Sequence, residues 1–375
     1  MWVSIIINNY NYGRFLKDAI DSALGQTYAQ LEVIVVDDGS TDNSREIIAG
    51  YGSRVIPILQ PNGGQAAAMN AGLARSAGHI VLFLDSDDVL LPHAVKDVVG
   101  AFRKQPDAAR VHFRMQVIDA SGEPTGVLKP HAHFPLVSGD LRQHVLYFPD
   151  DMPWLPTSGN AYSARVLRKI FPIPVQEYRI LADLYLSHIT PLFGPVIGLT
   201  EVGAQYRVHG GNNYEVTSLN LEQLRRTVQH WRTTHRYVRK FALAHRMISH
   251  PCQAPTNAMA CLANQLISLK LEPHKHLVPG DSVHKLFWAS VIAAGQRFNA
   301  SWQMKLFYIL WFLAMSLAPR SLARWLAVKW HFPETRKGLS SLLARFQWRQ
   351  RTDHAVASQQ TRPAVGGSRL PVRPA

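Results

Sequence analysis

Three carboxylates crowd into four consecutive positions of this chain, at Asp85, Asp87 and Asp88. They follow directly after the apolar run of residues 80–84, which is typical of a strand buried on both faces. Because like charges repel one another, we expect a cation among them, and a divalent metal with hard oxygen ligands is the natural candidate. Asp85 and Asp87 point the same way if the extended backbone continues. The alternative is that one of residues 86–88 caps a following helix.

Further apolar runs with helical segments between them must position these residues. The strand-like runs are residues 3–8, 31–36 and 55–59, and the helical segments are residues 14–24, 42–50 and 65–74. Such alternation predicts a parallel sheet with helices on both faces. Ligands of these sheets bind outside the carboxyl ends of the strands.

The carboxyl ends of the predicted strands are all polar, with Asn8, Asp37, Asp38, Asn62 and Gln65 at or near three of them. A structural protein needs polar turns, but it does not need two acidic clusters at neighbouring strand ends. No Gly-x-Gly-x-x-Gly follows the first strand and no Walker-type Gly-Lys-Ser/Thr occurs, which disfavours a dinucleotide or P-loop site. The pattern favours a nucleotide whose phosphates are held by a metal.

At these residues the chain resembles the family 2 glycosyltransferases of GT-A fold. The ordered motifs that carry the resemblance are residues 3–12, 35–42, 62–65 with 70–72, and 83–88, and the match extends over about residues 3–213. The resemblance implies a doubly wound mixed α/β sheet, with a Rossmann-like nucleotide half over about residues 1–105 and an acceptor half over about 106–214. A mainly helical region is expected to follow.

The resemblance also implies which residues hold the sugar donor. Asp37 and Asp38 would hold the base and ribose, Asp85 would contact the ribose side, and Asp87 would bind Mn²⁺ or Mg²⁺ bridging the diphosphate. For Asp88, capping and a role in the site stay open. The matching motifs add the donor-binding candidates Asn8, Tyr10, Asn62, Gln65 and Asn70.

Two later segments resemble the acceptor side of the family. Residues 155–161 resemble the small-residue segment that opens it, with Ser158, Gly159 and Asn160 as candidates, and residues 181–186 resemble the segment that carries the catalytic base. Here that base would be Asp183, because inverting transfer needs a carboxylate to take a proton from the attacking hydroxyl. Apolar neighbours would raise its basicity by desolvation. A cap or an ion-pair partner is the alternative.

Residues 206–212 resemble the segment that closes over the donor phosphates. His209 would be a further metal ligand there, or it would only shape the loop before two glycines. Arg207 would reach the diphosphate or would pair with an acidic loop residue.

The chain departs from the family pattern in places. Ala182 stands where many relatives have an acidic residue before the base, and Met69 stands where many have a basic residue, which removes one expected phosphate contact. The Gln-x-x-Arg-Trp motif of the processive synthases is absent, so one transfer per acceptor is expected.

Charge is distributed unevenly along the 375 residues. Residues 1–214 contain 17 Lys and Arg against 20 Asp and Glu, whereas residues 215–375 contain 23 against 6. The basic half should favour an anionic surface, either nucleic acid or the cytoplasmic face of a membrane. Cys252 and Cys261 fit no Cys-x-x-Cys pattern and are expected to be reduced and structural.

The basic half predicts helices with apolar faces. Residues 218–245 form an amphipathic helix, and residues 306–318 are apolar but short for a membrane span. With residues 321–332 they either lie in the membrane interface or are buried in a helical core. A basic helical region over 215–350 and a disordered tail over 351–375 are therefore expected.

These observations predict a cytoplasmic enzyme, peripheral at the inner face of the cell membrane. It would be a metal-dependent inverting glycosyltransferase that moves a single sugar per acceptor from a nucleotide donor. The first candidate donor is a UDP-sugar and the acceptor is a hydroxyl of a glycan or lipid-linked glycan, in cell-surface polysaccharide synthesis. The alternatives are a nucleotidyltransferase on a similar sheet, which would need a glycine-rich loop after the first strand, and a nucleic-acid-binding protein, which leaves the aspartates unexplained.

Overall fold

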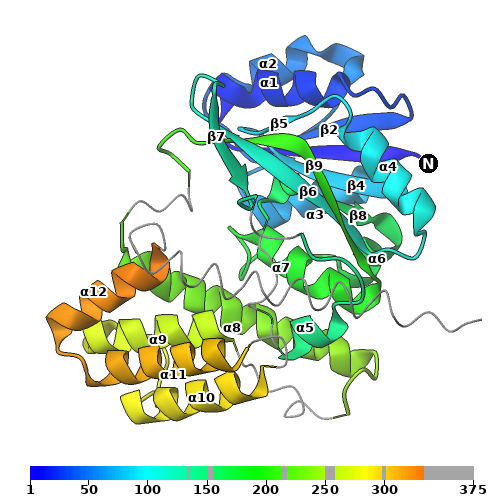
Figure 1. The fold of residues 1–375 in the computed structure, drawn as a ribbon. Coiled ribbons are helices and arrows are strands. Elements are labelled where there is room, and N and C mark those ends of the chain that lie inside the picture. The colour runs from blue at the N-terminus through cyan, green and yellow to red at the C-terminus, as the bar shows by residue number, and fades with distance from the viewer. Residues whose placement is uncertain are drawn as a thin grey trace, which may run out of the picture.

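The computed structural model describes residues 1–132, 136–147, 149, 155–212, 218–249, 258–297 and 301–332. One mixed sheet of nine strands lies between helices, and a separate stack of helices follows it (Figure 1). The predicted fold class, a doubly wound mixed sheet followed by a mainly helical region, is confirmed. The predicted tail over 351–375 lies outside the described residues.

The first four apolar runs form the parallel half of the sheet. They are β1 (Val3–Asn9), β2 (Leu31–Asp37), β3 (Ile56–Leu59) and β4 (Ile80–Asp85), in the spatial order β3-β2-β1-β4. The register pairs Asn8 with Asp85 and Asn9 with Asp37. The polar residues at the carboxyl ends of β1, β2 and β4 therefore meet at one edge of the sheet.

Alternate side chains of these strands face two separate cores, since successive residues of a strand point to opposite faces. On one face, Ile5 and Val35 belong to a core shared with α1 (Gly13–Leu24), α2 (Ser44–Gly50) and α4 (Ala94–Lys104). On the other face, Ile6 and Val36 belong to a core shared with α3 (Gln65–Arg75), α6 (Ala164–Ile170) and α7 (Ala182–Ile189). Burial on both faces explains why the strands are apolar throughout.

The remaining strands form the mixed half of the sheet. Next to β4 comes β8 (Asn160–Ser163), then β6 (Arg110–Ile118), β9 (Val196–Arg207) and β5 (Val89–Leu90), while β7 (Pro124–Lys129) pairs with β6. The register between β5 and β9 pairs Val89 with Gln205. The end of β9 is thereby brought back beside the acidic segment at 85–88.

The acidic segment does not cap a helix, so that alternative is wrong. Short strand β5 follows it directly, and α4 begins only at Ala94, with His93 at the N-cap position. The backbone N–H of Asp88 donates to the carbonyl of Asp85 over 3.1 Å, and this tight turn lets the chain pass from β4 into β5.

The helical region consists of α8 (Leu221–Ala244), α9 (Met259–Leu271), α10 (Val283–Gln296), α11 (Trp302–Leu317) and α12 (Arg320–His331); short α5 (Arg142–Tyr147) precedes it in the chain. The helix predicted over 218–245 is α8. Its first turn packs into the core of α9–α12 through Leu221 and Leu224. Its last turns pack into the core of the sheet unit through Val238 and Ala242, so α8 joins the two parts.

Helix α11 is the apolar segment predicted over 306–318. Trp311, Phe312 and Met315 are buried in the helical core, whereas Leu310 and Leu317 on the same helix are 53% and 77% exposed. One face is thus core and another is open to solvent. Among the described residues, no helix combines the length and the apolar character needed to cross a bilayer.

Candidate active site

A cavity of about 650 Å³ opens at the carboxyl ends of the central parallel strands. Its volume falls within the range of ligand sites, roughly 300–1,000 Å³. The predicted site residues that line it are Asn8, Tyr10, Asp38, Asn62, Gln65, Asp85, Asp87 and Asp183. The fold therefore brings the predicted catalytic base and the predicted donor-binding residues to one cavity, although they lie far apart in the sequence.

Asp38 shapes the loop on one side of the cavity. Its carboxylate accepts hydrogen bonds from Gln60 Nε2 at 2.6 Å and from the backbone N–H groups of Gly63 and Gly64 at 2.9 and 2.6 Å. Gly39, with φ near +80°, makes the close approach possible, because a Cβ there would lie 2.6 Å from the backbone nitrogen of Asn62.

Asp85 stands at the end of β4 among amide donors. Its Oδ1 accepts from Asn8 Nδ2 at 2.7 Å and from Gln65 Nε2 at 3.3 Å. Burial and the neighbouring charge of Asp87 raise the pKa of the Asp85 carboxyl to about 6. A cation placed here would relieve the repulsion between the two carboxylates.

Asp87 is hydrogen-bonded to His209, which lies in the segment after β9. The distance between His209 Nε2 and Asp87 Oδ2 is 3.0 Å, and Arg14 Nη2 lies 3.1 Å from His209 Nδ1. Since a guanidinium can only donate, Nδ1 accepts and Nε2 carries the proton that is donated to Asp87. The rings of Tyr12 and Phe15 pack against the imidazole at centroid distances of 5.3 and 4.9 Å.

The side-chain oxygen atoms at this end of the cavity suit a hard divalent cation. Asp85 and Asp87 offer carboxylate oxygens, which Mg²⁺ and Mn²⁺ prefer. In the part of the chain that the structure describes, no three His, Cys, Asp or Glu side chains converge in a way that could hold a metal ion. To bind a metal through Nε2, His209 would have to carry its ring proton on Nδ1 instead. Arg14 would then have to move away, because its guanidinium now donates to Nδ1.

Asp183 lies in the first turn of α7 and is buried against the cavity wall. Its Oδ1 accepts from the backbone N–H of Leu184 at 2.9 Å. Leu181, in the left-handed region at φ 65°, turns the chain into the helix. Gln65 connects this turn to the donor side, since its Oε1 accepts from the Ala182 N–H at 3.0 Å while its Nε2 reaches Asp85.

Asp88 is buried and structural. It accepts from Ser158 Oγ at 2.6 Å and from the Arg207 N–H at 3.0 Å, and so connects β4, β9 and the turn before β8. Burial, with the charges of Asp87 and Asp85, raises the pKa of Asp88 well above its ordinary value. Asp88 is not among the residues that line the cavity.

The three residues predicted on the acceptor side are buried and do not line this cavity. Ser158 accepts from the Asp85 N–H at 3.0 Å in addition to its bond to Asp88. Gly159 lies against Met115, and Asn160 Nδ2 donates to a backbone carbonyl at 2.8 Å. The adjacent Thr157 lines the cavity instead.

Two predicted donor-binding residues are also held by protein groups away from the cavity wall. Arg207 is buried, donates to Asp18 Oδ2 at 2.9 Å and stacks over Phe15 at 4.8 Å. Of its two predicted roles it therefore has the ion pair, but its acidic partner lies on helix α1 and not on a loop. Asp37 is buried and accepts from Arg45 Nε at 2.9 Å.

Asn70 is the third predicted donor-binding residue that does not line the cavity. It exchanges two hydrogen bonds with the backbone of Ile173, at 2.9 and 2.8 Å. The neighbouring Met69 is fully buried in the core. Position 69 therefore faces the core, and a basic residue there would not reach the cavity without changing the packing.

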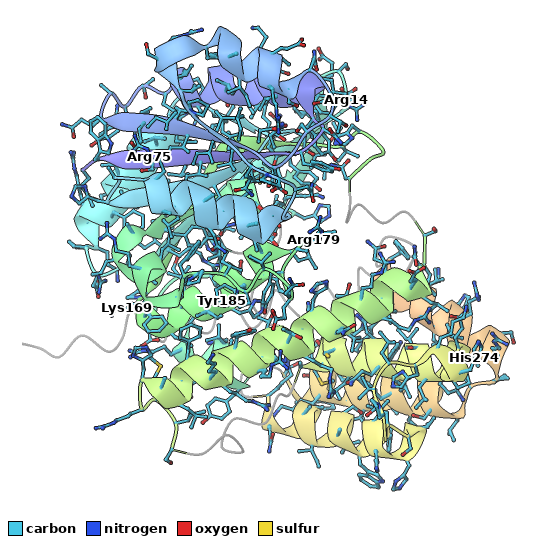
Figure 2. All side chains as sticks on the ribbon, turned by 180° about the vertical axis from the view of Figure 1, so that it is seen from behind. Arg14, Arg75, Lys169, Arg179, Tyr185 and His274 are labelled. Atoms are coloured by element: carbon cyan, nitrogen blue, oxygen red, sulfur yellow. The ribbon has the colours of Figure 1, made fainter. Side chains whose placement is uncertain are left out.

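Several lining residues were not predicted. Arg179 donates to Asn62, which also lines the cavity, and its labelled side chain lies on the side of the sheet unit that faces the helical region (Figure 2). Lys129 lies over the ring of Tyr206 at 3.9 Å, and both line the cavity. Arg179 precedes the matched base segment by two residues, which is a usable signal; nothing local distinguished Lys129.

Comparison with known proteins agrees with this geometry. A family model described as glycosyl transferase family 2 matches residues 4–171. An uncharacterised glycosyltransferase of Nostoc sp. is 38% identical over 246 residues, which are 64% of this chain and 76% of that protein. The chondroitin synthase of Pasteurella multocida is 40% identical over 123 residues, which are 32% of this chain but only 13% of that protein.

Solved structures share the fold. Residues 1–349 of S. aureus TarS in complex with UDP superpose with a TM-score of 0.52 at 15% identity, covering 88% of this chain and 91% of that one. The same protein in complex with UDP-GlcNAc gives 0.51 at 14% identity, covering 88% and 92%. The identity is too low to carry over a ligand, but the relatives establish the family. This chain belongs to glycosyl transferase family 2 and is a glycosyltransferase.

Proposed function

We propose that this glycosyltransferase moves one sugar per reaction from a nucleotide-sugar to a hydroxyl of a glycan or lipid-linked glycan. A UDP-sugar is the first candidate donor, and cell-surface polysaccharide synthesis is the proposed setting. The observation that carries the proposal is that Asp38, Asp85, Asp87 and Asp183 all line one cavity. A nucleotidyltransferase or a nucleic-acid-binding protein has no evident use for Asp183 in that cavity.

The donor would occupy the side of the cavity formed by the parallel strands. Asp38, Asn8 and Tyr10 line this cavity and would contact the nucleoside, and Asp85 and Asp87, which also line it, would supply carboxylates for a metal. A bound Mn²⁺ or Mg²⁺ would offset the negative charge that develops on the departing diphosphate. Arg179 and Lys129, which also line the cavity, would add positive charge near the phosphates.

Asp183 is the proposed general base. It would accept the proton of the acceptor hydroxyl as that oxygen attacks the anomeric carbon from the face opposite the nucleoside diphosphate, which inverts the configuration. The Leu184 N–H orients the carboxylate, and Gln65 ties the turn of Ala182 to Asp85. Acceptor and donor would thereby be positioned by one continuous set of hydrogen bonds.

We further propose that residues 1–214 form the catalytic unit and 215–350 a basic region that contacts an anionic membrane peripherally. The charge imbalance of the second half supports this, as do the exposed leucines of α11. An acceptor carried on a lipid would then be delivered to the cavity from the membrane surface.

The test is a thermal-shift panel of UDP- and GDP-sugars with and without Mn²⁺. A donor present at about 100 times its Kd stabilises the native state by about 2.7 kcal/mol, a rise of several degrees in Tm. Asp87→Ala should lose the Mn²⁺-dependent part of that rise, because it removes a carboxylate ligand. Asp97→Ala, an exposed acid of α4, is the matched control and should keep it.

Two outcomes would contradict the proposal. An unshifted Tm for every nucleotide-sugar in the wild type would remove the donor site. An Mn²⁺-dependent shift that survives in Asp87→Ala would place the metal elsewhere.

A further inference from the structure

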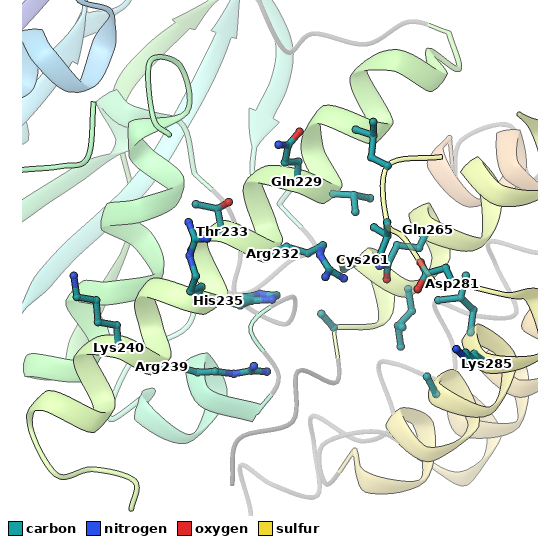
Figure 3. A pocket seen from close by; sticks show the side chains of 18 of the residues that line it. Gln229, Arg232, Thr233, His235, Arg239, Lys240, Cys261, Gln265, Asp281 and Lys285 are labelled. Atoms are coloured by element: carbon teal, nitrogen blue, oxygen red, sulfur yellow. The ribbon is translucent and has the colours of Figure 1, made fainter. Parts of the chain in front are cut away.

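A second and larger cavity lies in the helical region, between α8 and the pair α9 and α10. Its volume is about 1,200 Å³, and none of its lining residues lines the candidate active site. Figure 3 shows the labelled side chains of α8 on one side and Cys261, Gln265, Asp281 and Lys285 on the other, with Arg232 extending from α8 toward Cys261. We call this cavity the basic pocket.

One wall of the basic pocket is cationic. Arg232, Arg236 and Arg239 recur along α8 at steps of four and three residues, so they share one face, and Lys240 adjoins them. Lys285 of α10 adds a fifth cation from the opposite side. His235 also lines the pocket, and burial, with the charges of His188, Arg239 and Arg232, lowers the pKa of its imidazole well below the ordinary value.

Few acidic side chains line the basic pocket in the part of the chain that the structure describes. Among the described lining residues Asp281 is the one carboxylate, and it accepts from His276 Nε2 at 3.0 Å. Glu177 reaches Arg236 only at 3.8 Å, and that arginine side chain remains 67% exposed. Among the described lining residues, the cations Arg232, Arg236, Lys240 and Lys285 outnumber the one carboxylate of Asp281, an excess that an anion would offset.

The other wall of the basic pocket is apolar. Leu262 of α9, Leu286 and Ala289 of α10, and Leu277 before α10 line it. Leu277 is 51% exposed, as are Trp288 at 51% and Ile292 at 57% on the outer side of α10. Apolar surface thus continues from the pocket to the outside of the helical stack.

A short segment connects the basic pocket to the candidate active site. Glu177 contacts Arg236 at the pocket, Tyr178 shares a hydrogen bond of 2.8 Å with Thr234 of α8, and Arg179 lines the catalytic cavity. These three consecutive residues therefore contact, in order, Arg236 of the basic pocket, helix α8, and the candidate active site. Helix α8 would therefore lie between a ligand in the basic pocket and the segment that leads to Asp183.

We propose that the basic pocket binds an amphiphile with a phosphate or diphosphate head and an apolar chain. The arginines of α8 would take the phosphate oxygens, for which the guanidinium fork is suited, and the α9–α10 wall would take the first part of the chain. The same chemistry occurs in a lipid-diphosphate acceptor and in a membrane phospholipid. The acceptor reading rests on the proposed function, whereas the binding itself does not.

The test measures binding of four probes to the full chain by titration calorimetry. Farnesyl diphosphate represents a lipid diphosphate, dioctanoyl phosphatidic acid a phospholipid, pyrophosphate the head alone and farnesol the chain alone. We expect either amphiphile to bind at least tenfold more tightly than pyrophosphate or farnesol. The tighter of the two amphiphiles identifies the source of the natural ligand.

Two variants and one control localise the binding. Arg232→Gln with Arg239→Gln should weaken amphiphile binding at least tenfold, and Ala289→Phe should weaken it by filling the apolar side. Arg226→Gln, which changes the same charge on the same helix outside the pocket, should leave it unchanged. All variants should keep the nucleotide-sugar thermal shift, so a failure of this proposal is distinguishable from a failure of the catalytic one.

Three results would overturn the proposal. The first is equal amphiphile affinity in the wild type and the double arginine variant. The second is pyrophosphate binding as tightly as both amphiphiles. The third is a single-stranded oligonucleotide that displaces the amphiphile with the same dependence on Arg232, which would assign the pocket to nucleic acid.

Discussion

At the residue scale, the position of Asp183 depends on groups that are not its sequence neighbours. The left-handed turn at Leu181 starts α7, and Gln65 holds the first N–H of that helix while also contacting Asp85. The carboxylate is thus fixed relative to the donor side of the cavity. This is the arrangement that a base acting on an acceptor requires, because the attacking oxygen must meet the anomeric carbon at a defined point.

Asp183→Asn should bind donor normally and transfer little of it. An amide cannot take the proton of the acceptor hydroxyl, so kcat should fall by about 10²–10⁴, while the nucleotide-sugar thermal shift stays that of the wild type. Steady-state kinetics together with the melting curves check both halves of this expectation. Turnover close to that of the wild type would show that another group is the base.

Ser158 provides a contrasting case, because it was predicted on the acceptor side but is buried and does not line the cavity. Ser158→Ala should lower the free energy of unfolding by about 1–3 kcal/mol, since the buried Asp88 carboxyl and the Asp85 N–H each lose a partner. Denaturant melts measure the loss. A raised KM for acceptor with unchanged stability would instead favour direct acceptor contact.

The difference between these two residues shows what the sequence can predict about a site. Asp85 and Asp87 follow a buried strand, and the edge of a parallel sheet where they must lie is determined by that pattern alone. Whether Ser158 or Asn70 points into the cavity depends on packing partners, such as Asp88 and Ile173, that are distant in the chain. Local patterns carry no information about those partners.

At the scale of elements, those set by a local sequence pattern could likewise be predicted, whereas those that depend on distant partners could not. The four parallel strands could be predicted because burial on both faces makes them continuously apolar. Strand β7 could not, because most of its residues are exposed and its sequence, Pro-Thr-Gly-Val-Leu-Lys, has little strand character. Strand β5 has two residues and exists only because β9 lies beside it.

The contact between α7 and α8 contains two buried histidines, and it predicts a pH dependence of stability. His188 and His235 lie with ring centroids 6.4 Å apart. Burial lowers the pKa of His188 to about 4, and the charge of Arg110 acts in the same direction. Burial and the charges of His188, Arg239 and Arg232 lower the pKa of His235 well below its usual range.

Acid should therefore destabilise the protein through these histidines. Between pH 6.5 and about pH 4, the His188 imidazole binds a proton in the unfolded state but stays neutral in the folded state, so protonation favours unfolding. The stability that is present above pH 6.5 is therefore lost as the pH falls through this window. For His188 the loss at pH 5 is about 2 kcal/mol.

His188→Gln tests this assignment by comparing denaturant melts at pH 7.5 and pH 5. The variant should lose about 2 kcal/mol less than the wild type on acidification. Asp85 and Asp88 shift in the opposite sense but are present in both proteins, so the difference isolates the histidine. His93→Gln, an exposed histidine of the sheet unit, should behave like the wild type. An identical pH response in wild type and His188→Gln would refute the assignment.

At the scale of the whole molecule, the uneven charge seen in the sequence corresponds to two parts with different surfaces. The near-neutral half contains the sheet unit with its acidic cavity, and the described residues of the basic half form the helical stack. The sequence left open whether the apolar segment of α11 is core or interface. In the structure one apolar face of the helix is buried in the helical core and another is exposed, two faces that a count of apolar residues along the sequence cannot separate.

The outer face of α11 predicts membrane binding. Trp302, Leu306, Leu310, Leu313 and Leu317 recur at three- and four-residue steps and are between 39% and 77% exposed. Arg320 and Arg324 are exposed on the helix that follows. An apolar row flanked by cations is the pattern of a helix lying in an anionic interface, where each cation near the surface adds about 1 kcal/mol.

Replacing Leu306, Leu310 and Leu317 by Gln should reduce cosedimentation with phosphatidylglycerol vesicles at least tenfold, because the apolar area available for insertion is lost. Leu59→Gln with Val127→Gln, which removes exposed apolar side chains from the sheet unit, is the control and should bind as the wild type does. The triple variant should also keep amphiphile binding in the basic pocket, since none of its three changes lines that pocket. Vesicle binding that is undiminished in the triple variant would mean that this row of residues faces something other than a membrane.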